Sequence, residues 1–202
     1  MIRSMYQNKN NFILLLGIST ALCIVIFNIN NSFFWDGVHY GSIQPDFYYA
    51  THFTNYFVPD SMDSGEVPSF AMYIAAAWTL FGRTLTVSHL AMLPFVFGIV
   101  LQLFLLCRKF INPEYAGIAL ILLLADTTLL SQFSLVSPDL PLLFFFLLGL
   151  NSLLKNRKLL LAICICFLFL NITRGVLLSF CLLLFDIYLT NSLAKNWKEK
   201  FN

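Results

Sequence analysis

The chain has 202 residues, of which 59% are hydrophobic and 11% are charged, and its formal net charge is +2. Globular domains carry about 25% charged residues, and the uncharged stretches here approach the roughly 20 residues that cross a bilayer. The composition therefore excludes a soluble domain. It predicts an all-α, polytopic membrane protein that forms a single transmembrane domain over residues 1–202, with membrane lipid and no nucleic acid among its partners.

Apolar segments divide the chain into spans and loops. The first, rich in Leu and Ile, lacks a small-x-small cleavage site after it, so we expect a retained signal-anchor helix. A shorter apolar stretch at 69–82 suits a re-entrant or interfacial helix better than a span. With it, residues 29–85 form one outer loop containing interfacial helices. About six spans are predicted, at 12–28, 86–107, 115–134, 138–154, 159–173 and 175–190.

The charges predict the orientation of these spans, because cytoplasmic loops retain Lys and Arg. With the N-terminus in the cytoplasm, only Arg83 and Arg174 of the 12 basic residues face outward. The inner segments then hold Arg3, Lys9, Arg108, Lys109, Lys155, Arg157, Lys158, Lys195, Lys198 and Lys200, and the outer side holds Asp36, Asp46, Asp60, Asp63, Glu66 and Asp139. A span at 69–82 would largely cancel this bias. We expect a multi-pass protein of the bacterial plasma (inner) membrane.

The outer loop contains the segment Phe33–Tyr40, FFWDGVHY, and an aromatic segment, Pro45–Phe57, that suits the membrane surface. Asp36 lies beside Trp35 among other aromatic residues. Partial removal from water would raise the pKa of such a carboxyl group and suit it to proton transfer. The alternative is an ordinary solvated loop residue.

Asp139 and Arg174 are predicted on the same outer face as Asp36. Asp139 lies in SPDLP, where Pro138 suits a helix start and a carboxylate meets the positive end of the helix dipole. It is either a capping residue or part of a site. Arg174, in NITRG, is a candidate ligand for an anion such as a phosphate. The alternative is an arginine that reaches the lipid headgroups.

Other polar groups are weaker candidates. Asp126 lies well inside a predicted span, where ionisable residues are functional candidates, but it could instead be protonated or bonded to a neighbouring helix. The loop residues His52, Asp60, Asp63 and Glu66 are candidate ligands of a divalent metal, although their spacing matches no specific metal pattern. The five cysteines lie in or at the ends of apolar runs, so we expect no disulfide.

The order of these motifs resembles the N-terminal half of the type C membrane glycosyltransferases. A first span precedes an outer loop with Trp35-Asp36 near its start. Then follow Val67–Gly82, a span ending in CRKF, the SPDLP segment, a basic KNRK turn and a span ending in NITRG. The protein O-mannosyltransferases and the bacterial aminoarabinose transferases are the most similar branches. Each motif is short, and the resemblance rests on order and spacing over about residues 12–190.

The resemblance implies a donor sugar on a polyprenyl phosphate and transfer to an extracytoplasmic acceptor, which could be a glycan, a lipid or a protein. It implies that Asp36 and Asp139 are catalytic, with Asp36 as the base. It also implies that Arg174 lies near the donor phosphate, and we expect His39 and Tyr40 to bind substrate. Direct displacement at the anomeric carbon would invert its configuration.

The sequence departs from the family in several places. The acidic pair of the first outer loop is reduced to Asp36, because Gly37 replaces the expected Glu. Pro68 stands alone where two prolines are usual, and Ser88-His89 replaces an Arg. Family members are longer, so we expect this chain to be the start of a longer protein or a truncated or split product. Its donor groove would then be incomplete without later spans, and inactivity of this piece alone is one outcome that follows. The competing hypotheses are a transporter or flippase fragment using Asp126 and Arg174, and a non-catalytic subunit of a polysaccharide-assembly complex.

Overall fold

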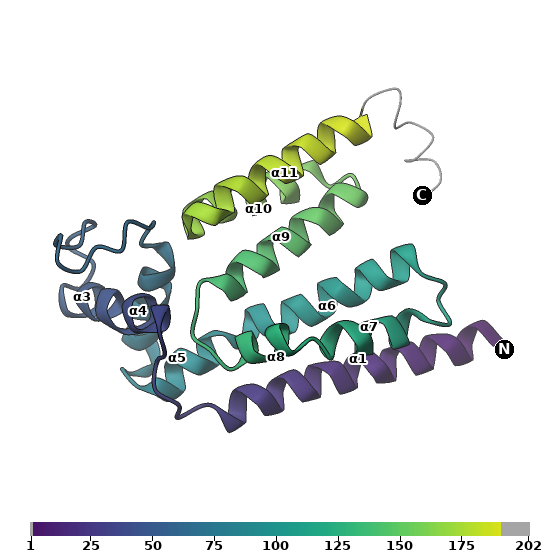
Figure 1. Ribbon diagram of the computed structural model, residues 1–202, viewed down its shortest axis with the longest axis horizontal. Coiled ribbons are helices and arrows are strands. Elements are labelled where there is room, and N and C mark those ends of the chain that lie inside the picture. The colour runs from purple at the N-terminus through teal and green to yellow at the C-terminus, as the bar shows by residue number, and fades with distance from the viewer. Residues whose placement is uncertain (1, 191–202) are drawn as a thin grey trace.

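The computed structural model describes residues 2–190, and these residues form only helices, turns and loops (Figure 1). The all-α prediction is confirmed. The helical segments are α1 (Ile2–Phe27), α2 (Asp36–Val38), the π-helical turn η1 (His39–Ile43), α3 (Gln44–Ala50), α4 (Ser69–Phe81), α5 (Leu85–Ala91), α6 (Leu93–Phe110), α7 (Ala116–Leu124), α8 (Thr127–Phe133), α9 (Asp139–Leu154), α10 (Lys158–Asn171) and α11 (Thr173–Thr190).

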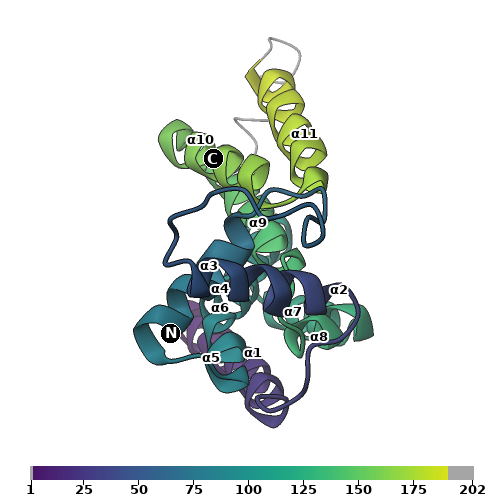
Figure 2. The same ribbon diagram turned by 90° about the vertical axis from the view of Figure 1, so that its left-hand side faces the viewer.

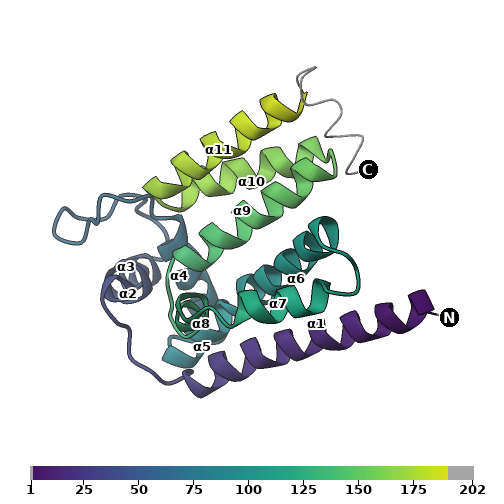
Figure 3. The same ribbon diagram turned by 45° about the vertical axis from the view of Figure 1, so that its right-hand side comes forward.

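The long helices run along the long axis of the molecule (Figure 1). At one end lie the start of α1, the turn from α6 to α7, and the turn from α9 to α10. At the other end lie α2, η1, α3, α4 and the loop that follows α3. Figure 3 shows α9, α10 and α11 on one side of α6, with α1 and α7 on the other.

Three helical stretches are long and apolar enough to cross a membrane: Asn8–Phe27, Leu85–Phe110 and Thr173–Thr190. A fourth crossing results if α7 and α8, which are bent by 70°, form one broken span. With 16 and 14 residues, α9 and α10 are shorter than the roughly 20 residues of a usual span. The structure therefore contains three to four candidate spans among its described residues, compared with the six predicted from the sequence.

The predicted continuous span at 115–134 is interrupted at Asp126. Oδ1 of Asp126 accepts a hydrogen bond of 2.8 Å from the Leu129 amide, and the backbone of Asp126 is extended. This is an N-cap, which satisfies an amide that the first turn of a helix leaves unpaired. Asp126 thus begins a second helix, α8.

The core lies around α6. Val96, Ile99 and Val100 are fully buried there, against Val25 of α1 and Leu140 of α9. A second apolar cluster joins α9, α10 and α11. The outward surface of the long helices is also apolar, with exposed Phe12, Leu122, Leu159, Leu177 and Phe180. Such a surface suits a lipid environment.

One buried polar contact crosses this core. The Nδ2 group of Asn151 in α9 donates to Oε1 of Gln102 in α6 at 3.0 Å. Both side chains are buried, so this hydrogen bond fixes the register of α6 against α9. All five cysteines are free, as the sequence predicts.

The basic residues of the turns lie at the end of the bundle opposite to α2 and η1. Arg108 and Lys109 end α6, and Lys155, Arg157 and Lys158 surround the turn from α9 to α10. Lys158 also forms an ion pair with Asp186 of α11. The predicted inner residues Lys195, Lys198 and Lys200 lie outside the described residues.

Candidate functional site

The start of α9 lies at the end of the bundle that carries α2 (Figure 2), and the predicted catalytic residues Asp36 and Asp139 line one cavity there. The ends of two further helices are tied together there. The Asn171 side chain at the end of α10 donates to the carbonyl oxygen of Pro138 at 2.7 Å. Ser69 of α4 donates to the carbonyl oxygen of Leu170. These contacts hold the first turn of α9 beside the junction of α10 and α11.

Asp139 is the first residue of α9, and its side chain is 32% exposed. The hydroxyl of Ser137 accepts a hydrogen bond from the Asp139 amide at 3.2 Å and lies 3.3 Å from Oδ2 of the same residue. The other carboxylate oxygen, Oδ1, lies 3.2 Å from Nη2 of Arg174. Asp139 is therefore both part of the helix start and an ion-pair partner.

Arg174 lies in the first turn of α11, one residue before Gly175. A Cβ atom at Gly175 would lie 1.9 Å from the carbonyl oxygen of Leu168, so only glycine allows this approach of α11 to α10. The Arg174 side chain is 66% exposed. Its anionic partner in the described structure is Asp139, and the exposed part of the guanidinium remains accessible to a ligand.

Arg83, the other arginine predicted to face outward, is also paired. Its Nη2 atom lies 2.8 Å from Oδ1 of Asp46, and its guanidinium lies 5.7 Å from the centre of the Trp78 ring. Arg83 and Arg174 thus each have an aspartate partner, and of these two pairs only that of Arg174 includes a predicted catalytic residue.

Asp36 and Asp139 line the same cavity, which has a volume of about 330 Å³. Asp36 begins α2, and the close approach of α2 to the segment before α9 depends on Gly37. A Cβ atom there would lie 3.1 Å from the carbonyl oxygen of Val136. The packing therefore restricts position 37 to a small residue.

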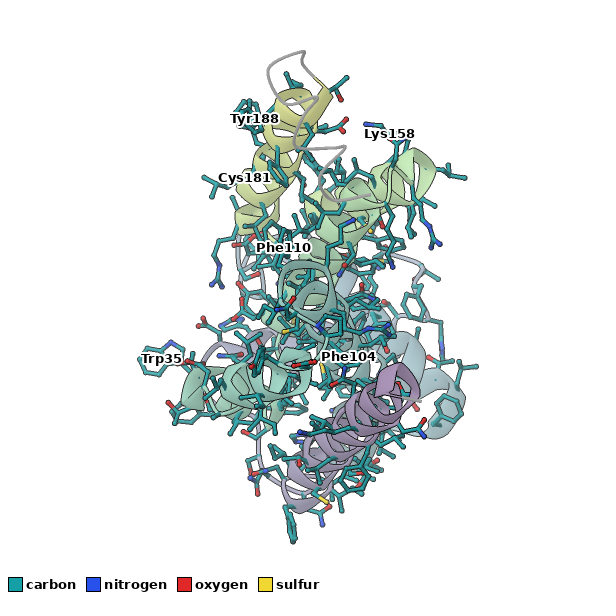
Figure 4. The ribbon with its side chains drawn as sticks, turned by 90° about the vertical axis from the view of Figure 1, so that its right-hand side faces the viewer. Trp35, Phe104, Phe110, Lys158, Cys181 and Tyr188 are labelled. Carbon is teal, nitrogen blue, oxygen red and sulfur yellow. The ribbon has the colours of Figure 1, made fainter. Side chains whose placement is uncertain are left out.

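Trp35 precedes Asp36 in an unusual conformation. Its φ angle is 50° and its ψ angle is −127°, although it is not glycine. Its side chain is 78% exposed and projects from the edge of the molecule in Figure 4. Such backbone strain gathers at functional sites, although it does not by itself identify a function.

Tyr40 lies on η1 near the same charges. Burial raises the pKa of Tyr40 above its ordinary value of 10.0, the Ser64 side chain lowers it, the carboxylates of Glu66 and Asp36 raise it, and Arg174 lowers it. The phenol is therefore protonated at neutral pH and can donate a hydrogen bond. Tyr40 thus lies within electrostatic reach of Asp36 and Arg174.

Glu66 makes a contact with Thr173 that was not predicted from the sequence. Its Oε2 atom accepts hydrogen bonds from the amide and the hydroxyl of Thr173, the first residue of α11. A carboxylate at this position satisfies an unpaired helix amide and interacts favourably with the helix dipole. The contact joins residues 107 positions apart and fixes the turn that carries Arg174.

The loop before Glu66 is tied to η1 and α3. The buried Gln44 donates from Nε2 to the Ser64 hydroxyl at 2.9 Å and to the Met62 carbonyl oxygen at 3.2 Å. The loop turns at Gly65, whose φ of 71° favours glycine and whose amide donates to Oδ1 of Asp63.

Other candidates lie apart from this cluster. His39 is exposed and is not among the residues that line the cavity. The proposed divalent-metal ligands His52, Asp60, Asp63 and Glu66 do not gather. Within residues 2–190 no group of three or more His, Cys, Asp or Glu side chains could hold a metal ion. The carboxylate of Asp126 accepts the Leu129 amide as the N-cap of α8.

Comparison of the chain with protein-family models, with curated proteins and with solved structures gave no significant match. The features that bear on function are therefore the cluster of Asp36, Tyr40, Asp139 and Arg174 and the order of motifs in the sequence.

Proposed function

We propose that this chain is a membrane glycosyltransferase, or the N-terminal part of one, that moves a sugar from a polyprenyl-phosphate donor to an extracytoplasmic acceptor. One observation carries the proposal: Asp36 and Asp139 line one cavity, and Arg174 lies 3.2 Å from Asp139. An acceptor needs a base, a donor phosphate needs a cation, and this arrangement supplies both within one end of the helical bundle.

The reaction proposed for these residues is a direct displacement. Asp36 takes the proton of the acceptor hydroxyl as the acceptor oxygen forms its bond to the anomeric carbon. The bond between that carbon and the phosphate oxygen breaks, and the polyprenyl phosphate leaves with the electron pair. Arg174 stabilises the phosphate, Asp139 orients Arg174, and Tyr40 donates a hydrogen bond to substrate. The configuration of the sugar inverts.

We also propose six crossings of the plasma membrane, with α4 as an interfacial or re-entrant helix and the N-terminus in the cytoplasm. The support is the distribution of charge. The basic turns after α6 and α9 lie at one end of the bundle, and Asp36, Asp139 and Glu66 lie at the other. The positive-inside rule makes the basic end cytoplasmic, so the candidate site lies on the outer side.

The capping role of Asp126 removes the main argument for a transporter. An intramembrane carboxylate is a candidate for an ion pathway, but the side chain of Asp126 is exposed and accepts the Leu129 amide as a helix cap. A helix cap explains this carboxylate without any pathway.

Two measurements test the proposal on the full chain in native membranes. Labelling of single cysteines from outside, with the five native cysteines replaced, should modify positions 32, 137 and 173 but not 156; position 32 is exposed and precedes Asp36 in the same segment. Transfer of radiolabelled sugar from polyprenyl-phosphate donors should then fall about 100-fold or more in Asp36→Asn, as expected for loss of a general base. The matched control is Asp60→Asn, an exposed acid of the same loop.

Two results would contradict the proposal. Labelling of position 156 without labelling of 137 and 173 would place the predicted site residues on different sides of the membrane. Unchanged transfer in Asp36→Asn, with correct insertion, would remove Asp36 from the mechanism.

A further inference from the structure

The cavity beside Asp36 has the chemistry of a ligand site. Its volume of about 330 Å³ falls within the range of small-molecule sites, which begins at roughly 300 Å³. Its wall comes from the segment between α1 and α2, from α5, and from the end of α8 through the start of α9. Three stretches distant in sequence thus enclose one space.

The charge of the residues that line the cavity determines which ligands it can bind. Asp36 and Asp139 both contribute carboxylates, and no Lys or Arg is among the described residues that line the cavity. An anionic ligand would be repelled there. Arg174, which suits a phosphate, contacts the Asp139 side chain but does not line the cavity. In the proposed reaction the donor phosphate would therefore lie at Arg174, beside the cavity and not inside it.

The other residues that line the cavity include both polar and aromatic side chains. Gln132 lines the cavity, and its buried Oε1 atom has no hydrogen-bond partner among the described residues. A buried amide oxygen without a partner costs free energy, and a ligand hydroxyl can supply the missing donor once the amide rotates. Phe34 and Trp35 also line the cavity and are largely exposed, so they offer flat apolar surfaces to a ring.

We infer that this cavity binds an uncharged or amino-bearing sugar ring of the acceptor, with one ring hydroxyl directed to Asp36. A sugar ring presents several hydroxyl donors to the carboxylates and to Gln132, and an apolar C–H face to the aromatic rings. The inference rests on the proposed function and deepens it, because it makes the acceptor a glycan hydroxyl rather than a phosphate or a peptide hydroxyl.

Saturation-transfer difference NMR on the full chain tests this directly. The protein should be held in a polymer free of sugar, since glycoside detergents would compete. The probes are methyl glucoside, methyl glucosaminide, glycerol phosphate and a neutral serine tripeptide. We expect saturation of the two glycosides and none of the phosphate or the peptide. Trp35→Ala and Gln132→Ala should each weaken the glycoside signal at least about 5-fold, and Phe57→Ala, an exposed aromatic of the same loop outside the cavity, should not.

A second experiment distinguishes a free glycan from a lipid-linked glycan as the ligand. It compares the saturation of a free oligosaccharide with that of a glycolipid in nanodiscs. Saturation of both supports recognition of the ring itself. Saturation of glycerol phosphate or the tripeptide in place of the glycosides would overturn the inference, and so would a glycoside signal that persists unchanged in both cavity variants.

The transfer assay distinguishes this inference from the proposed function. Glycoside binding with no effect of Asp36→Asn on transfer would leave the cavity as a sugar site and reject the enzyme mechanism. Transfer to a peptide or phosphate acceptor, with no glycoside binding, would retain the mechanism and reject the sugar-ring acceptor.

Discussion

Asp139 and Arg174 face each other from the first turns of two different helices, with 3.2 Å between Oδ1 and Nη2. Both residues lie in the first turn of a helix: Asp139 is the first residue of α9 and Arg174 is the second residue of α11. The carboxylate lies at the favourable end of its helix dipole, and the guanidinium at the unfavourable end of its own. The ion pair compensates the unfavourable placement of Arg174, and a bound phosphate could do the same.

Arg174→Gln should raise KM for the lipid-linked donor by about 10-fold or more, because a phosphate loses a charge-assisted hydrogen-bond donor. Arg83→Gln is the matched control, since Arg83 is also an exposed arginine paired with an aspartate. Steady-state kinetics with the polyprenyl-phosphate donor measures both. An equal change in the two variants would show that the effect is general surface charge.

Gly175→Ala should prevent normal packing of α11 on α10, because its Cβ would meet the Leu168 carbonyl oxygen at 1.9 Å. We expect a loss of several degrees in the thermal midpoint of the purified protein, or no recoverable folded protein. Gly17→Ala is the control, since its Cβ would approach closely only the movable Cδ1 end of Leu124, at 2.9 Å, and would lie at ordinary contact distances from the Val100 and Leu120 side chains. A Gly175→Ala protein as stable as the Gly17→Ala protein would contradict the described helix junction.

Glu66→Ala should release the loop from the start of α11, since two hydrogen bonds to Thr173 are lost. Proteolysis of residues 51–68 from the outer side should accelerate, and KM for the donor should rise as the Arg174 turn loosens. A double-mutant cycle with Thr173→Val should be clearly non-additive. Full additivity would mean that the two residues do not interact. Asp60→Ala is the control for a change of loop charge alone.

Tyr40 should ionise only at a pH above the ordinary tyrosine value, and its charged neighbours should shift this pH in opposite directions. Glu66→Gln should lower the pKa of Tyr40, because the carboxylate raises it, and Arg174→Gln should raise the pKa further. A pH titration of tyrosinate absorbance, compared with Tyr40→Phe, isolates this group. Shifts of the same sign in both variants would contradict the cluster.

The raised pKa of Tyr40 also determines how its contribution to the stability of the folded protein changes with pH. The folded state holds the Tyr40 proton more tightly than the unfolded state, so this contribution to stability is complete below about pH 10 and is lost as pH rises through the folded pKa. Tyr40→Phe should therefore remove part of the alkaline loss of stability.

Asp126→Ala should cost about 0.5–2 kcal/mol, the usual range for loss of an N-cap, and leave sugar transfer intact. Chemical denaturation in mixed micelles measures the first effect and the transfer assay the second. Abolished activity with unchanged stability would support a role for this carboxylate in a transport pathway.

Local features of the fold were predictable from the sequence where apolar periodicity is continuous. The predicted helix at 69–82 appears as Ser69–Phe81, and the predicted span at 86–107 appears within Leu85–Phe110. The break at Asp126 was not predicted, because a hydropathy average does not register one capping residue inside an apolar run.

The candidate site was predictable in part for a similar reason. Alternation of the spans places Asp36, Asp139 and Arg174 at one end of the bundle, and the structure brings them together. The contact of Glu66 with Thr173 could not be derived from one sequence, since it depends on how a long loop returns to a helix 107 residues away. The pairing of Arg83 with Asp46 is another such long-range contact.

The shortness of α9 and α10 has a consequence for the surrounding lipid. At about 1.5 Å of rise per residue, the 14 residues of α10 span roughly 21 Å, whereas the hydrocarbon layer is about 30 Å thick. Under the proposed topology, thinning of the bilayer beside this helix pair is one way to accommodate the mismatch. Thinning on that flank lowers the headgroup layer toward the start of α11, so a phosphate carried by a membrane lipid would arrive at the depth of Arg174 without leaving its leaflet.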